Sequence, residues 1–309
     1  MGTSYHISVV DTPDGAGRAE YQSDIDQALA RIDAAMSTWR ADSEISRLNA
    51  APVGEAFALS EELHAVLAES VRVSALSGGA FDVTVAPVLA AWGFGPGSPG
   101  PRMADAAQLA SLAGGVGSAG FVLSDDPPAL RKRAPRSFEL SAIAPGFAVD
   151  VVAEAFLARG ARDFMIEIGG EVRTAGQNPD GRPWRIGVEQ PDAPPGTPAI
   201  AVSLRSEAVS TSGDYREFFV ADGKRYSHTI DPRTLRPVSH RLASVTVIAP
   251  TCMRADALST ALMVLGPEAG MALAEREGLA VYMLLRDGEG FEARHSRAFG
   301  PYLRPDAKS

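Results

Sequence analysis

Met253-Arg-Ala-Asp-Ala-Leu-Ser-Thr-Ala-Leu-Met-Val-Leu265 is the stretch of this 309-residue chain that constrains the fold most, and it predicts a helix. Asp256 and Thr260 stand four residues apart and therefore share one helix face, with Cβ atoms about 5–6 Å apart. A carboxylate and a hydroxyl are hard oxygen groups, which suit Mg²⁺. The helix dipole alone also favours an Asp in a first turn. The pair therefore indicates either a metal site or an ordinary helix end.

A second segment, Glu139-Leu-Ser-Ala-Ile-Ala-Pro-Gly-Phe147, predicts a strand at residues 138–140, a tight loop at 141–146 and a helix over 147–157. A backbone carbonyl in the loop would supply a third oxygen ligand for the metal. A plain connection between a strand and a helix is the alternative interpretation of the same residues.

A third segment, Ser227-His-Thr-Ile-Asp-Pro232, places His228 just before an Asp-Pro turn. A turn that fixes the backbone after a histidine would hold its ring in one orientation. Imidazole titrates near neutral pH, so it suits the deprotonation of a hydroxyl group. A lone histidine is more often structural or exposed, and both interpretations stay open at this point.

The composition is that of a globular protein, with 45% hydrophobic and 22% charged residues and a net charge of −9. This acidity argues against a nucleic-acid partner. Phosphate on a substrate would need arginine, backbone N–H groups or a metal, because lysine is scarce: Lys132, Lys224 and Lys308. The single cysteine excludes an internal disulfide and a zinc–thiolate cluster. We expect no transmembrane segment and find no signal peptide.

Strands and helices mix without the strict alternation of a parallel doubly wound sheet. We therefore predict an α+β fold with mixed sheets and flanking helices, in a single domain over residues 1–309. Two lobes with the active site in the cleft are expected. Strands are predicted at residues 5–9, 121–123, 164–168, 184–188, 200–204, 215–220, 244–248 and 281–285. Helices are predicted at residues 25–36, 60–76, 104–112, 147–157, 253–265 and 268–275, and a loop at 40–47.

Two further places offer groups for a flat ligand. Trp39 would stack on a heterocycle, although a core aromatic at a helix end is the alternative. The turn Ala80-Phe-Asp82 would cup a ring and accept hydrogen bonds, although apolar–polar turns of this kind are common.

The order of the motifs is more specific than any one of them. The series resembles the FAD:protein FMN transferase family, the ApbE-type flavin transferases, from residue 1 to about residue 285. The matching segments are Met1-Gly-Thr3, Ser37-Thr-Trp-Arg-Ala-Asp-Ser-Glu-Ile-Ser46, Ser77-Gly-Gly-Ala-Phe-Asp-Val-Thr-Val-Ala-Pro87, Trp92-Gly-Phe94, Leu140-Ser-Ala-Ile-Ala-Pro-Gly-Phe-Ala-Val-Asp150, Ile168-Gly-Gly-Glu171, Ser210-Thr-Ser-Gly-Asp-Tyr-Arg216, Ser227-His-Thr-Ile-Asp-Pro232, Ser244-Val-Thr-Val-Ile-Ala-Pro250 and Ala255-Asp-Ala-Leu-Ser-Thr260.

The resemblance implies that the chain binds FAD and Mg²⁺ and transfers FMN from FAD to a threonine or serine hydroxyl of a partner flavoprotein, with release of AMP. It implies metal ligation by the Ala144 carbonyl, the Asp256 carboxylate and the Thr260 hydroxyl. His228 would be the base, and Asp256 the second catalytic residue. The implied FAD contacts are Met1, Trp39, Ala80, Phe81, Asp82, Ser141, Phe147, His228 and Ile230.

Two alternatives to the transferase remain: an Mg²⁺-dependent FAD pyrophosphatase that yields FMN and AMP, and a non-catalytic FAD-binding protein. The resemblance also implies a periplasmic or cell-envelope location. Many relatives carry a lysine where this chain has Pro145, and a frequent tyrosine is replaced by Phe147. A lysine contact to the flavin or phosphate is therefore not carried over, and a hydroxyl hydrogen bond is lost while ring stacking remains.

Overall fold

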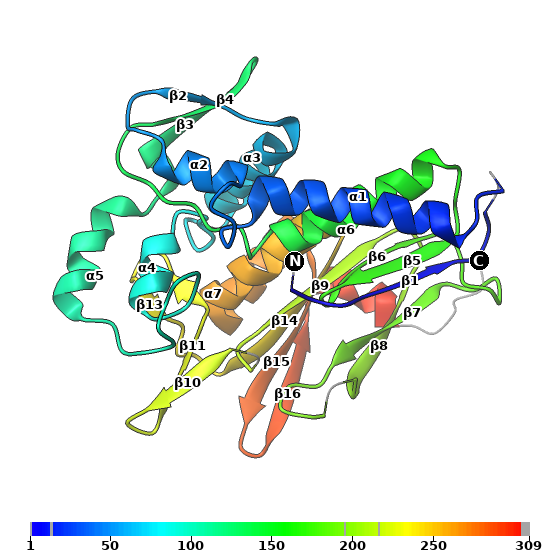
Figure 1. Ribbon diagram of the computed structural model, residues 1–309. Helices are drawn as coiled ribbons and strands as arrows, with labels where there is room; N and C mark the ends of the chain where they lie inside the picture. The colour runs from blue at the N-terminus through cyan, green and yellow to red at the C-terminus, as the bar shows by residue number, and fades with distance from the viewer. Residues whose placement is uncertain (1, 13–14, 195, 216, 304–309) are drawn as a thin grey trace. The chain divides into compact units, whose positions relative to one another are not determined.

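The computed structural model describes residues 2–12, 15–194, 196–215 and 217–303, and it shows an α+β fold (Figure 1). The helices are α1 (Arg18–Met36), α2 (Glu44–Ala50), α3 (Glu61–Leu76), α4 (Ala86–Ala91), α5 (Ala106–Leu112), α6 (Ala144–Ala158) and α7 (Cys252–Glu277), with 3₁₀ turns η1 (Ala113–Gly115), η2 (Ser118–Gly120) and η3 (Arg297–Leu303). The strands are β1 (Tyr5–Val9), β2 (Ala56–Ala58), β3 (Phe121–Asp125), β4 (Pro128–Lys132), β5 (Phe164–Ile168), β6 (Glu171–Ala175), β7 (Trp184–Glu189), β8 (Pro198–Leu204), β9 (Ala208–Gly213), β10 (Phe218–Ala221), β11 (Lys224–Ser227), β12 (Ile230–Asp231), β13 (Arg236–Pro237), β14 (Leu242–Ala249), β15 (Ala280–Asp287) and β16 (Gly290–His295).

The chain forms two compact units, each built from discontinuous segments. Unit 1 comprises Met1–Ala30, Pro145–Gly213 and Arg241–Ser309, and unit 2 comprises Arg31–Ala144 and Asp214–His240. The α+β class predicted from the sequence, with several sheets and flanking helices, is confirmed. The single domain over residues 1–309 and the active-site cleft stay predictions.

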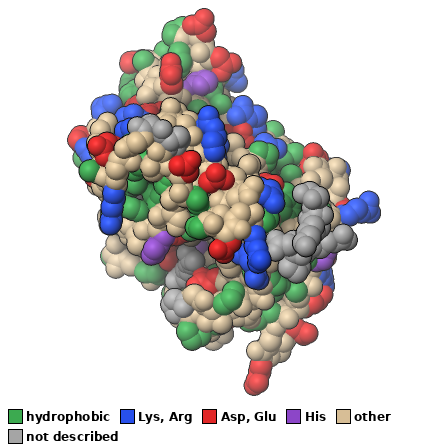
Figure 2. Space-filling model, turned by 90° about the vertical axis from the view of Figure 1, so that its right-hand side faces the viewer, with side chains coloured by type: hydrophobic (Ala, Val, Ile, Leu, Met, Phe, Trp, Pro, Cys, Tyr) green, Lys and Arg blue, Asp and Glu red, His purple; other side chains and the backbone are tan. Residues whose placement is uncertain are grey.

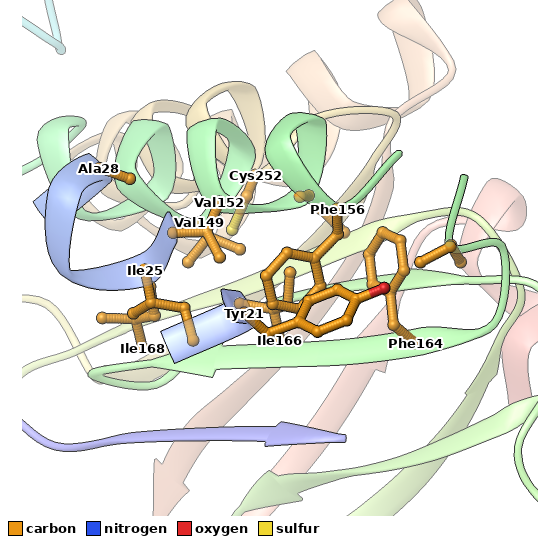
Figure 3. Close-up of a cluster of buried hydrophobic side chains, with 14 residues drawn as sticks. Tyr21, Ile25, Ala28, Val149, Val152, Phe156, Phe164, Ile166, Ile168 and Cys252 are labelled. Atoms are coloured by element: carbon orange, nitrogen blue, oxygen red, sulfur yellow. The ribbon is translucent and has the colours of Figure 1, made fainter. Parts of the chain in front are cut away.

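Unit 1 is organised around a seven-stranded sheet in the order β1-β5-β6-β9-β14-β15-β16. Each of these strand pairs is antiparallel. Apolar side chains of α1, α6 and β5 form one buried cluster, in which Tyr21 and Phe156 meet edge to face with ring centroids 4.8 Å apart (Figure 3). A second buried cluster joins β7, β8 and η3 to sheet strands through Val202, Tyr282 and Phe299. Helices and the β7–β8 hairpin thereby bury the apolar side chains of the sheet.

Helix α7 is the central helix of unit 1. It contacts β14 and β9, and every residue of β14 is buried. Gly266 has φ 78° and ψ 178°, and Pro267 follows it, so the two helices predicted at residues 253–265 and 268–275 meet at this kink. By length and composition α7 could cross a membrane, but 67% of its apolar window is buried inside the protein, as in a core helix of a soluble protein.

Unit 2 packs short elements around its own core. A three-stranded sheet has the order β2-β4-β3, and β10 pairs with β11 in a hairpin. Another core cluster includes Trp92, Phe94 and Ile230, and the Trp92 indole N–H donates to the Leu235 carbonyl at 2.9 Å. Helix α3 begins as predicted, because the Ser60 hydroxyl accepts the Leu63 N–H at 3.2 Å.

The loop predicted at residues 40–47 is wrong in its second half, because α2 begins at Glu44. The Ser43 hydroxyl accepts the Ser46 N–H and caps this helix. The strand expected at residues 215–220 is the shorter β10, and residue 216 lies outside the described residues.

The strand predicted at residues 138–140 is also wrong. The backbone of Phe138 bonds the Asn49 side chain, with N–H to Oδ1 at 2.7 Å and Nδ2 to the carbonyl at 3.0 Å. The Glu139 N–H donates to the Val83 carbonyl at 2.8 Å. These backbone groups are therefore satisfied without a neighbouring strand.

Helix α6 begins at Ala144 and not at residue 147, so the predicted loop at 141–146 is half helical. Pro145 is compatible with a first turn, where its missing N–H has no intrahelical partner to lose. Gly146 lies against α7, because a Cβ there would stand 2.5 Å from the Cys252 carbonyl oxygen and 2.8 Å from the Asp256 Cβ.

We predict that Gly146→Ala lowers the free energy of unfolding by about 1–3 kcal/mol, because the added methyl forces α6 away from α7. Urea unfolding measures the change. Gly300→Ala is the matched control, since a Cβ at Gly300 meets no atom within 4 Å. Equal stabilities of the two variants would contradict this packing.

Candidate active site

Asp256 is a buried carboxylate at the contact between α6 and α7. Its side chain is on α7, the residue is 5% exposed, and Oδ2 accepts the Gly146 N–H at 2.9 Å. Only a glycine lets the α6 backbone come this close to Asp256, because a Cβ at residue 146 would stand 2.8 Å from the Asp256 Cβ. Asp256 lies on a helix, as the sequence predicts. Its hydrogen-bond partner Gly146, which is 110 residues away in the sequence, was not predicted.

Burial raises the pKa of Asp256 from 3.8 to about 7. The Gly146 N–H opposes this shift, and the nearby negative charge of Asp150 adds to it. No cationic side chain contributes among the described residues. Ionised Asp256 is therefore a buried anion that a cation would stabilise.

Asp150, on α6, holds the start of α7 in place. Its two carboxylate oxygens accept the N–H groups of Cys252 and Met253, each at 2.9 Å, and Arg173 donates to Oδ1 at 2.9 Å. Burial raises the pKa of Asp150, while these N–H groups and Arg173 oppose the shift. Asp150 thus caps α7 from another helix and fixes the turn that carries Asp256.

Thr260 lies one turn after Asp256 and shares a network of hydroxyl groups. The Ser212 Oγ on β9 lies 3.1 Å from the Thr260 Oγ1 and 2.8 Å from the Ser259 Oγ. Ser259 in turn donates to the Asp256 carbonyl at 2.9 Å. The network orients the Thr260 hydroxyl on the helix face that carries the buried carboxylate.

These donors fit a hard divalent cation. Asp256 offers a carboxylate without a cationic partner in the described part, Thr260 offers a hydroxyl, and Ala144 is the buried first residue of α6. A carbonyl has two lone pairs, so that of Ala144 can serve a helix bond and a cation. Residues 2–12, 15–194, 196–215 and 217–303 contain no cluster of three or more His, Cys, Asp or Glu that could hold a metal. A metal bound by Asp256 would therefore need other oxygen ligands, such as the Thr260 hydroxyl on the same helix face.

The candidate ring contacts of unit 2 differ in exposure. Trp39 is 75% exposed, which excludes the alternative of a core aromatic. Ala80 and Phe81 are buried, and the Asp82 Oδ1 accepts the Thr84 N–H at 2.8 Å and the Thr84 hydroxyl. Asp82 therefore fixes its own turn, while the Trp39 ring is available to stack.

The other predicted contacts have separate environments. Ser141 is exposed, and its N–H donates to the Glu139 Oε1 at 2.9 Å. Phe147 is half-buried on α6, and Ile230 is buried in the Trp92 cluster. Met1 lies outside the described residues.

His228 directly follows β11, and its ring is oriented by the backbone. The Glu217 carbonyl lies 3.1 Å from the His228 Nδ1 and also accepts the His228 N–H at 3.0 Å. A proton on Nδ1 satisfies this carbonyl and leaves Nε2 as an acceptor. The Phe94 ring meets the imidazole edge to face at 6.4 Å between centroids. With its ring held in this way, His228 presents Nε2 as a free-standing acceptor for a proton if Nδ1 carries the ring proton.

Residues 1–283 match the ApbE family. The chain belongs to the ApbE family. A relative from Vibrio cholerae named FAD:protein FMN transferase is 41% identical over 308 residues, which cover 98% of this chain and 90% of the relative. An Escherichia coli K12 relative of the same name is 35% identical over 306 residues, 98% of this chain and 87% of the relative.

Solved ApbE structures share the fold. The flavinyl transferase ApbE of Pseudomonas stutzeri, in its apo form, has a TM-score of 0.91 at 40% identity and covers 98% of this chain and 94% of its own. The flavin transferase ApbE of Vibrio cholerae has a TM-score of 0.89 at 39% identity, over 98% and 96% of the two chains. The family resemblance predicted from the motif order is confirmed.

Sequence reasoning assigned no role to three groups that position candidate site residues in the structure. Asp150, Ser212 and Glu139 were visible only as parts of motifs. The contacts of Asp150 with α7, of Ser212 with Ser259 and Thr260, and of Glu139 with Thr38 join residues at least 47 positions apart, so local spacing carries no signal for them. The position of Asp150 at the end of a motif segment, four residues after Gly146, was the nearest hint for it.

We predict that Asp256→Asn stabilises the metal-free protein at pH 8. The pKa of Asp256 is higher in the folded chain than in the unfolded one, so deprotonation opposes folding. The resulting loss in the free energy of unfolding appears above about pH 4 and is complete above about pH 7. Asn still accepts the Gly146 N–H but carries no charge.

Thermal unfolding in chelator at pH 8 and pH 5 measures the effect. The gain in the free energy of unfolding is expected to be on the order of a few kcal/mol at pH 8 and to shrink strongly at pH 5. A variant that is less stable than the parent at pH 8 would show that the buried charge has a cationic partner after all.

Proposed function

We propose that this chain is an Mg²⁺-dependent FAD:protein FMN transferase that attaches FMN to a threonine or serine of a partner flavoprotein and releases AMP. Family membership and the names of its relatives support the transferase activity. The observation that carries the metal assignment is the buried Asp256 carboxylate, whose pKa is raised to about 7 with no described cation beside it.

The acceptor hydroxyl is deprotonated by His228 in this proposal. The proton moves to Nε2, which the Nδ1 contact with the Glu217 carbonyl leaves unprotonated. The acceptor oxygen forms a bond to the FMN phosphorus, the pyrophosphate bond to the AMP phosphate breaks, and AMP leaves with the bridging oxygen.

Asp256, Thr260 and the Ala144 carbonyl would hold Mg²⁺. When bound, Mg²⁺ neutralises charge on pyrophosphate oxygens and orients in-line displacement. The hydroxyl network of Ser212 and Ser259 keeps Thr260 directed for this role. Pro145 supplies no charge, so the phosphates would be neutralised by the bound Mg²⁺, by arginine or by backbone N–H groups.

FAD itself would contact the groups predicted from the resemblance. Exposed Trp39 stacks on a flat ring, and the fixed turn of Ala80, Phe81 and Asp82 lines the ligand. Phe147 contributes an apolar ring without a hydroxyl. Ser141 and the backbone near Ile230 contribute polar contacts.

Location on the periplasmic or cell-envelope side and the absence of a nucleic-acid partner stay predictions. Acidic and basic side chains are interspersed over the face in Figure 2, and the net charge is −9. This distribution favours a protein acceptor over a polyanion.

We predict that the chain, with FAD, Mg²⁺ and an acceptor flavoprotein domain, adds one FMN to the domain. Mass spectrometry of the acceptor measures the product. Asp256→Ala and His228→Gln should each lower the rate by roughly 10²–10⁴-fold, because one removes the metal carboxylate and the other the base. Asp26→Ala is the matched control, since Asp26 is an exposed carboxylate on α1.

An unchanged rate in Asp256→Ala would refute the metal assignment. Failure of every acceptor domain, with intact FAD bound, would instead favour a non-catalytic FAD-binding protein.

We predict that FAD hydrolysis without an acceptor is much slower than transfer, because water is not held beside His228 as an acceptor hydroxyl would be. Chromatography of free FMN and AMP, with and without the acceptor domain, compares the two rates. FMN release that is equally fast in both cases would support the FAD pyrophosphatase alternative.

A further inference from the structure

Glu139 makes three hydrogen bonds that connect separate segments of unit 2. Its Oε2 accepts the Thr38 hydroxyl at 2.8 Å, and its Oε1 accepts the Ser141 N–H at 2.9 Å. Its own N–H donates to the Val83 carbonyl at 2.8 Å. Both oxygens of one carboxylate are therefore used, together with the backbone of the same residue.

Each partner adjoins a group assigned to FAD. Thr38 precedes Trp39, whose ring is 75% exposed. Val83 follows the turn of residues 80–82, and Ser141 is itself a predicted contact. Trp39 and Ser141 are about 100 residues apart, and the Glu139 carboxylate is the bridge between their segments.

The position of Glu139 is fixed from its N-terminal side. Asn49 clamps both backbone groups of Phe138, so the Glu139 side chain starts from a defined place on the chain. Segment 138–140 has no strand partner that could align it. A cavity of about 360 Å³ is lined by Thr38, Phe94 and Glu139, so the bridge forms part of a cavity wall.

We propose that Glu139 is a positioning residue for FAD, which holds the Trp39 segment, the 80–82 turn and the Ser141 segment in their binding alignment. The inference rests on the proposed function, because it takes FAD as the ligand of these segments. Glu139 acts through Thr38 and Ser141 and transfers no proton to the substrate.

A glutamine at this position keeps one oxygen for the Ser141 N–H, and its NH₂ group can donate to the Thr38 hydroxyl, which turns to accept, so both contacts remain but the charge is lost. Glu139→Gln should therefore weaken FAD binding only slightly. Glu139→Ala removes both bonds and should weaken FAD binding by roughly 10-fold or more. The KM of Glu139→Ala for FAD should rise by a similar factor, while kcat at saturating FAD changes little.

The experiment is a titration of the full chain with FAD, followed by quenching of tryptophan fluorescence. Trp92 and Trp184 are buried, whereas Trp39 is exposed. Trp39→Phe identifies the part of the signal that reports on the site.

Asp105→Asn is the matched control, because the Asp105 Oδ1 accepts two backbone N–H groups at the start of α5 in the same unit, more than 20 residues along the chain from each of these segments. It should leave FAD binding unchanged. A double-mutant cycle with Thr38→Val tests the bridge itself, and the effects of Thr38→Val and Glu139→Ala should be less than additive. Circular dichroism and thermal unfolding of each variant confirm that it is folded.

A folded Glu139→Ala variant that binds FAD as tightly as the parent would overturn the proposal, even if FMN transfer proceeds. Additive effects in the cycle would overturn the Thr38 bridge. A parent that binds FAD and shows the Glu139 effect but transfers no FMN would sink the proposed function and leave this inference standing.

Discussion

The hydrogen bond from the Gly146 N–H to the Asp256 carboxylate is the constraint on which the site depends. It joins the first turn of α6 to the first turns of α7 and buries a carboxylate at their contact. The closeness of the two helices requires a glycine, and the burial raises the pKa of Asp256 to about 7. Packing and chemistry are thus determined by the same two residues.

Neighbouring groups make this contact rigid. Asp150 caps the N-terminus of α7 and is itself bound by Arg173, so the helix start cannot shift without breaking several charged hydrogen bonds. Ser212 and Ser259 orient Thr260 from the other side. In unit 2, Glu139 has a comparable organising role, because it ties together segments that the sequence separates widely.

Local signals in the sequence were sufficient for much of this arrangement. The four-residue spacing of Asp256 and Thr260, the helix predicted at residues 60–76 and the strand predicted at residues 5–9 depend on neighbours in the chain, and the structure has all three. The strand expected at 138–140 failed because Asn49, nearly 90 residues earlier, satisfies its backbone. The roles of Asp150 and Glu139 could not be predicted for the same reason, since the α7 N–H groups that Asp150 accepts and the Thr38 hydroxyl that Glu139 accepts are about 100 residues away in the sequence. Trp39 was ambiguous because exposure depends on the folded surroundings.

The central claim is that Asp256 and Thr260 hold the divalent cation that FMN transfer requires. Anomalous diffraction from crystals grown with FAD and Mn²⁺ in place of Mg²⁺ tests it most directly. The account predicts a manganese peak within about 2.0–2.4 Å of the Asp256 carboxylate and the Thr260 hydroxyl, with the Ala144 carbonyl as a further ligand. A manganese ion bound by other residues, with the Asp256 carboxylate bonded only to the Gly146 N–H, would contradict it.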